Sequence, residues 1–128
     1  LDAKTKSQHF SEVKEGDANG MTSDMYMLGW GVPTFDSHYV YSYLFDSAGS
    51  WNKVNFSNAR VDELVAAMGV ETDLDKRNAM IAEAWDITQD DVTYLPLHHQ
   101  VVNQASKGNV DVPIRMNNEP LFRFANVN

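Results

Sequence analysis

Four histidines are the first residues whose types could support chemistry, and that chemistry would be metal binding: His9, His38, His98 and His99. Adjacent residues of a strand point to opposite faces, so His98 and His99 make a poor chelating pair. No two histidines have the i, i+4 spacing of a helical metal pair. The chain has no cysteine, which excludes thiolate ligands. We therefore expect no metal site, with one of the adjacent histidines facing a polar interior and the other facing water.

Motifs for hydrolysis, carboxylate catalysis and phosphate binding are weak. No G-x-S-x-G elbow is present, and the serines of residues 47–50 have the composition of a loop. Carboxylates such as Asp73 and Asp75 lie in or beside predicted helices, where capping explains them. A glycosidase needs two carboxylates across its substrate, and no spacing here brings a pair together. No glycine-rich loop opens a helix. We expect no catalytic residues and a non-enzymatic protein, with a hydrolase as an alternative.

Residues 23–40, SDMYMLGWGVPTFDSHYV, place Trp30 between Gly29 and Gly31 at the end of an apolar run. Glycines let other groups approach the backbone closely, and an indole offers a flat apolar face with one N–H donor. Trp30 is either a core aromatic at a strand end or a stacking wall for a small ligand, and the glycines favour the wall. Asp36 is predicted to cap a helix, and a charge near the pocket is its second role.

Length and composition indicate one globular domain with a moderate core. The chain has 128 residues, of which 43% are hydrophobic and 22% charged. No apolar run approaches the roughly 20 residues of a membrane helix. The net charge is −8 and the 10 basic residues form no cluster. We therefore expect no nucleic-acid partner, no membrane insertion and no binding to anionic membrane surfaces. Nothing in the sequence indicates a cofactor.

The first part of the chain is predicted to hold two helices and one strand ahead of Trp51. A short helix is expected over about residues 7–15, stopped by Gly16, and an exposed loop follows to residue 24. Residues 25–28 read as a short buried strand. A helix then begins at Asp36 or Ser37, with one face that carries Val40, Tyr43 and Leu44.

Two further helices have clear periodicity. The first is capped by Ser57 or Asn58 and ended by Gly69 as a C′ residue. Its buried stripe is predicted to be Val61, Leu64, Val65 and Met68. The second begins with Thr72 and Asp75 at capping-box spacing. One face of this second helix is predicted to carry Leu74, Arg77, Ile81, Ala84, Trp85 and Thr88.

The last part of the chain is predicted to form strands. Residues 92–106 read as a strand whose start Pro96 weakens, residues 107–120 are rich in turn formers, and residues 121–127 form a final short strand. The fold class is therefore α/β, or α+β for a fragment taken alone. The pattern lacks the repeated βαβ units of a complete doubly wound domain.

Three sequence blocks, taken together with DMYMLGWG, carry a resemblance to a known family: NARVDELV, DKRNAMIAEAW and DVTYLPLHH. Across nearly the whole chain, their order and spacing resemble the C-terminal part of the dipeptide/oligopeptide-type solute-binding proteins of ABC transporters, the family 5 extracellular solute-binding proteins. The resemblance implies a two-lobed periplasmic-binding-protein type II fold. Residues 1–94 would belong to the second, C-terminal lobe. Residues 95–128 would form a hinge-crossing strand and a tail that returns to the first lobe.

The resemblance also implies a cellular role. Such proteins are far longer than one domain, so the chain would be about the last quarter of its parent, with a signal peptide in the preceding part. The parent would be periplasmic, would bind a peptide or a peptide-like solute, and would deliver it to an ABC transporter permease. A sugar, an opine or a metal chelate is an alternative ligand, and a stand-alone interaction domain is an alternative class.

The resemblance implies a ligand-binding segment made of Trp30, Gly31, Val32, Pro33 and Asp36. In peptide-binding members an aspartate three residues after the tryptophan pairs with the terminal ammonium of the ligand. Pro33 stands at that position here and has neither charge nor N–H. Asp36 matches the acidic residue that follows in the family, although Ser37 replaces its proline, and Asp36 would act as the anchor only if the loop folds back.

Apolar residues in the last third of the chain predict self-association. Without the remainder of the parent, residues 95–105 and 119–127 would be unpaired sheet edges. Such edges are templates for pairing with another chain. We expect a dimer or a higher oligomer, formed by strand exchange.

Overall fold

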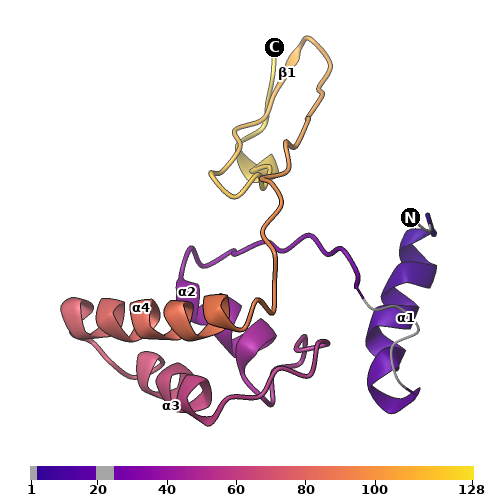
Figure 1. Cartoon of the computed structure of the whole chain (residues 1–128). Helices are drawn as coiled ribbons and strands as arrows, with labels where there is room; N and C mark the ends of the chain where they lie inside the picture. Colours follow the sequence, from indigo (N-terminus) through magenta and orange to yellow (C-terminus); the bar gives the residue numbers. More distant parts are fainter. Residues whose placement is uncertain (1–2, 20–24) are drawn as a thin grey trace.

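The computed structural model describes residues 3–19 and 25–128 as a small, mixed, helix-rich domain with a two-stranded sheet, which is compatible with an α/β class (Figure 1). The described residues form no second lobe. In chain order, the elements are α1 (Lys6–Asn19), α2 (Ser37–Val40), the π-helical turn η1 (Tyr41–Phe45), α3 (Ala59–Met68), α4 (Leu74–Asp90), β1 (Val110–Asp111), the 3₁₀ turn η2 (Phe122–Phe124) and β2 (Asn126–Val127).

The hydrophobic core lies where α3 packs against α4 and against η1, as the lower part of Figure 1 shows. The predicted stripe of α3 is confirmed, because all four of its residues are buried. The core consists of Tyr41, Leu44, Phe45, Phe56, Val61, Leu64, Val65, Met68 and Ala84. These side chains come from α3, η1 and the loop between them, with a single residue from α4.

Helices α3 and α4 each begin directly after a residue whose side chain caps the helix. Asn58 caps α3, as predicted, and its side-chain oxygen accepts hydrogen bonds from the backbone N–H groups of Arg60 and Val61. The capping box predicted for α4 is wrong by one residue, because Asp73 is the cap and accepts from the N–H of Asp75 at 3.1 Å. A carboxylate directly before the first turn satisfies orphan donors and complements the positive helix end.

The predicted face of α4 is correct only in part. Ala84 and Thr88 are buried and Arg77 is half-buried, whereas Leu74 and Trp85 are exposed. Leu74 lies in the first turn of α4, where 73% of the residue is exposed. Gly69 is the C-cap of α3 with φ −67°, and not a C′ residue as predicted.

The strand predicted over residues 25–28 is wrong, and so is the predicted end of the first helix. Residues 25–31 are extended, but their backbone makes no hydrogen bond to the backbone of another described residue, and Met25 and Met27 are exposed. Helix α1 continues through Gly16 to Asn19, because one glycine costs a helix only about 1 kcal/mol. The remainder of the predicted loop, residues 20–24, lies outside the described residues.

The strand predicted over residues 92–106 is also absent from the structure. In the part of the chain that the structure describes, the backbone of residues 95–106 forms no hydrogen bond with other backbone groups, and Leu95, Leu97, Val101 and Val102 are exposed. A strand needs a neighbour for its N–H and C=O groups, and no described segment lies in register with this one.

A small hairpin closes the chain and stands away from the helices (Figure 1). Strands β1 and β2 pair antiparallel, with Val110 opposite Val127, and Ile114 forms an isolated bridge with Pro120. Of the predicted final strand only Asn126–Val127 is extended in a sheet, because η2 interrupts the segment. The expectation that residues 119–127 form an unpaired edge is therefore wrong at Asn126–Val127.

The chain exposes more surface than a compact protein of its size. Its solvent-accessible surface is 9723 Å², whereas a compact monomer of 14.4 kDa exposes about 6,800 Å². The extended segments and the projecting hairpin account for this excess.

The end of α4 gives a first testable prediction. Val92 follows the C-cap Asp91 with φ 53°, its N–H donates to the carbonyl of Gln89, and its side chain is exposed. A residue with a Cβ atom pays about 1–2 kcal/mol for a left-handed backbone conformation, and glycine is the usual residue at this position. We expect Val92→Gly to raise the free energy of unfolding by about 1 kcal/mol in urea titrations. Val92→Ala keeps the Cβ, and an equal gain from it would contradict this account.

Candidate ligand-binding site

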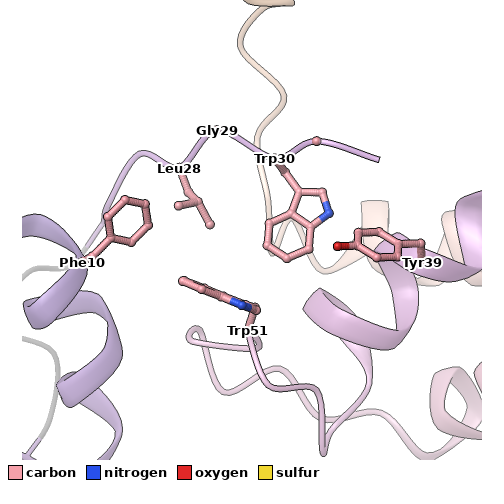
Figure 2. Close-up of a pocket in the computed structure, with 7 residues that line it drawn as sticks. Phe10, Leu28, Gly29, Trp30, Tyr39 and Trp51 are labelled. Carbon is pink, nitrogen blue, oxygen red and sulfur yellow. The ribbon is translucent and has the colours of Figure 1, made fainter. Parts of the chain in front are cut away.

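A pocket of about 310 Å³ lies between α1, the extended segment 25–31 and the loop that follows η1 (Figure 2). Four of its lining side chains are aromatic. We call it the aromatic pocket, and its lining residues are Phe10, Leu28, Gly29, Trp30, Gly31, Tyr39 and Trp51. None of them is fully buried, so the pocket opens to solvent.

The rings of the aromatic pocket are set at steep angles around Trp51. The ring centroids of Phe10 and Trp51 are 6.0 Å apart with planes at 81°, and those of Trp30 and Trp51 are 6.0 Å apart at 67°. In Figure 2 Trp51 lies below the open space, Phe10 and Trp30 stand on either side of it, and Leu28 points in from above. A bound group would therefore meet apolar surfaces on several sides.

Helix α2 and the turn η1 position Trp30. The ring centroids of Tyr39 and Tyr43, one helical turn apart, are 4.7 Å from each other, and each lies 6.0 Å from the centroid of Trp30. Among the described residues, the indole Nε1 of Trp30 is buried and has no hydrogen-bond partner. A buried donor without an acceptor costs free energy. An acceptor on a bound molecule would recover this cost.

Side chains from distant segments hold the extended stretch 25–31 in place. The Nε2 atom of His9 lies 2.9 Å from the carbonyl oxygen of Met27, which joins this stretch to α1. Tyr26 lies beside Tyr94, and burial together with this neighbour raises the pKa of the Tyr94 hydroxyl. These contacts replace the strand pairing that the sequence predicted.

The two glycines beside Trp30 are not required by backbone conformation, because neither has a left-handed φ. A Cβ built on Gly31 would meet nothing within 4 Å, and one built on Gly29 would lie 3.8 Å from Oε1 of Gln100. The packing of the described residues therefore gives no reason for glycine at position 31. A ligand that approaches the backbone at this rim would give one.

The structure separates the five predicted ligand-binding residues. Trp30 and Gly31 line the aromatic pocket, whereas Val32 and Pro33 belong to a turn in which the N–H of Phe35 donates to the carbonyl of Val32 at 3.1 Å. Asp36 is the N-cap of α2 and accepts from the N–H of His38 at 2.9 Å, which confirms the predicted cap. Contact of these residues with a ligand stays a prediction.

The carboxylate of Asp36 already has a cationic partner. The Nη2 atom of Arg77 donates to Oδ1 and to Oδ2 of Asp36 at 2.9 Å each, and the Nε of the same guanidinium donates to the carbonyl of Met68 at 3.0 Å. The hydrogen bonds from Arg77, and then the N–H of His38, hold the pKa of Asp36 below its usual value. The pair of Asp36 and Arg77 thus links α2, α3 and α4.

Five of the seven lining residues were not among the predicted ligand-binding residues: Phe10, Leu28, Gly29, Tyr39 and Trp51. Trp51 lies in a stretch assigned to a loop by its composition. A tryptophan among serine, glycine and asparagine was the available signal, because a large aromatic residue in a polar loop needs a surface to pack on.

A second pocket of about 320 Å³ lies between α4 and the α2–η1 helix, and mostly apolar side chains line it, among them Val40, Tyr41, Ile81 and Trp85. Asp86 is the one carboxylate among its lining residues.

The two adjacent histidines, His98 and His99, are both exposed. The expectation that one of them faces a polar interior is therefore wrong. Within residues 3–19 and 25–128 no group of three histidine or acidic side chains could hold a metal ion.

Comparison of the chain with protein-family models, with curated protein sequences and with solved structures found no match. None of the described helices is long and apolar enough to span a membrane.

Proposed function

We propose that this chain is the C-terminal part of a periplasmic solute-binding protein for ABC-transporter uptake, and that the aromatic pocket contacts the solute. One observation carries the proposal. Trp30 and Gly31, which the family resemblance assigns to the ligand site, line a pocket with three further aromatic side chains from other parts of the chain. Pockets with aromatic walls and few polar groups are typical of small-molecule sites.

The open side of the aromatic pocket supports a two-lobed parent. Ligand sites in proteins bury most of the ligand surface, and the residues that the structure describes leave this pocket open to solvent. In the proposed parent, the first lobe closes over the solute, and the closed form docks on the permease. The surface that the chain exposes beyond a compact monomer, about 2,900 Å², would be enough for packing against such a lobe.

The site favours recognition of a side chain over recognition of a peptide amino terminus. Pro33 carries no charge, and Asp36 is paired with Arg77 outside the pocket lining. No carboxylate therefore stands where peptide-binding relatives anchor the terminal ammonium. A peptide would be held by an apolar or aromatic side chain stacked in the pocket, and an opine, a sugar or a metal chelate stays an alternative solute.

Trp30→Ala and Gly31→Ala test the proposal as a pair. We expect Trp30→Ala to weaken solute binding at least about tenfold, because it removes a stacking wall. Gly31→Ala is expected to leave the free energy of unfolding within about 0.5 kcal/mol yet to weaken binding, because its new methyl group occupies the rim. Intrinsic fluorescence titrated with di- to pentapeptides, opines and sugars provides the measurement. Solutes that bind both variants as tightly as the unaltered chain would place the site elsewhere.

Self-association through the exposed segment 95–105 is a further part of the proposal. We expect the isolated chain to form dimers or higher oligomers at high concentration, measured by light scattering. A lysine on an exposed edge opposes pairing, so Val101→Lys should shift the chain toward monomer. Val70→Lys is the matched control, since Val70 and Val101 have similar exposed fractions of 81% and 80% and Val70 lies outside the segment. A strictly monomeric chain, or equal effects of both lysines, would refute this part.

A further inference from the structure

We infer that the second pocket, between α4 and the α2–η1 helix, is an interaction surface that receives the turn η2, Phe122–Phe124, from a second copy of this chain. The inference rests on the self-association proposed above and is independent of the solute site. It names the two surfaces that meet when two copies associate.

The second pocket combines apolar walls with acceptor oxygens that lack a partner. Ile81 and Trp85 belong to its walls, and Asp86 is its one carboxylate. Among the described residues, Asp86 forms no ion pair, and the buried hydroxyl of Tyr41 has no hydrogen-bond partner of good geometry. Burial, with the nearby charge of Asp86, raises the pKa of this hydroxyl, so it stays protonated. The pocket therefore suits an apolar side chain that lies beside a positively charged donor.

The turn η2 carries the complementary groups. Phe122 and Phe124 are both exposed, and Arg123 stands between them. Arg123 forms no ion pair with a described residue, and its guanidinium carbon lies 4.6 Å from the centroid of the Phe124 ring. Two aromatic rings around an unpaired guanidinium thus match an apolar pocket that holds an unpaired carboxylate. Aromatic residues and arginine are also the residues that most often anchor protein interfaces.

The path of the chain favours a second copy as the source of this turn. Tyr94 packs against Phe45, which lines the second pocket, and segment 95–105 then leads to a hairpin that stands away from the helices (Figure 1). A projecting element on a long connection can dock on a partner copy instead of on its own core. The chain exposes about 2,900 Å² beyond a compact monomer, and a standard interface covers only about 800 Å² of each partner.

Exchange of the two charges tests the contact. Asp86→Arg and Arg123→Asp each bring like charges together, so each variant alone should associate at least about tenfold more weakly than the unaltered chain. Sedimentation equilibrium over a concentration series measures the dissociation constant. A 1:1 mixture of the two variants should associate as tightly as the unaltered chain, because each variant supplies the charge that the other needs. Docking of η2 within one chain would not respond to mixing and would overturn the inference.

Asp90→Arg and Lys107→Asp are the matched controls. They make the same charge changes on α4 outside the pocket lining and before β1, and they should alter association by less than about threefold. If the mixture stays as dissociated as its components, or if each variant behaves like its control, the inference is wrong. Dissociation by Val101→Lys alone would then leave segment 95–105 as the interface, and the proposed function would stand. A strictly monomeric unaltered chain would overturn both the inference and the proposed self-association.

Discussion

Replacing Phe45 by alanine is expected to lower the free energy of unfolding by about 4 kcal/mol, the usual cost of emptying a buried aromatic site. The Phe45 side chain is 5% exposed. Its ring packs edge-on against Phe56 at 5.9 Å and against Tyr94 at 5.1 Å, and lies 5.3 Å from Tyr41. Phe45 thus joins η1 to the loop before α3 and to the segment after α4. Chemical denaturation followed by circular dichroism measures the change.

Phe122→Ala is the matched control for Phe45→Ala. Phe122 is 73% exposed in the C-terminal hairpin, and exposed substitutions usually change stability by less than about 0.5 kcal/mol. Similar losses for the two variants would contradict the core described above.

Replacing Arg77 by methionine is expected to lower the free energy of unfolding by about 2 kcal/mol. Methionine keeps the apolar stem but removes the donors to Asp36 and to the carbonyl of Met68. The Arg77 side chain is 20% exposed and that of Asp36 is 38% exposed. Solvent therefore screens part of the charge interaction, and the value stays below that of a fully buried pair. Thermal and urea unfolding at pH 7 measure the loss.

The same pair predicts how stability depends on pH. Arg77 lowers the pKa of Asp36 in the folded chain. The charged carboxylate therefore stabilises the fold above the unfolded value of about 4, and this contribution is lost as the pH falls through the lower, folded pKa. In Arg77→Met this part of the acid dependence should become smaller, because only the N–H of His38 still lowers the pKa of Asp36. Arg115→Met, which breaks an exposed pair with Glu119, should leave it in place. If the free energy of unfolding of Arg77→Met fell at acid pH as steeply as that of the unaltered chain, the role given to Asp36 would be contradicted.

Features that depend on neighbouring residues were predictable from the sequence. The four-residue stripe of α3 repeats at helical spacing, and Asn58 and Asp36 cap helices whose first turns follow at once. In each case the side chain and its partners lie within about one helical turn of sequence, so the pattern carries the information.

Features that depend on distant partners were not predictable. Residues 25–28 and 95–100 have the composition of strands, but a strand forms only beside another strand, and composition does not say whether one is there. Phe10 and Trp51 meet across the aromatic pocket from separate elements, and neither carries a local signal for the other. The same holds for Arg77, whose periodic place on α4 predicts burial of its stem but not its link to Asp36.

The central claim, that the aromatic pocket is a solute site, is tested most directly by the indole N–H resonances. The chain has three tryptophans. Trp30 and Trp51 line the aromatic pocket, and Trp85 lies at the second pocket on α4. In ¹⁵N-labelled protein titrated with the panel of peptides, opines and sugars, we predict that the signals of Trp30 and Trp51 shift with one common dissociation constant while that of Trp85 stays in place. Shifts of Trp85 alone, or no shift of any of the three at saturating solute, would contradict the claim.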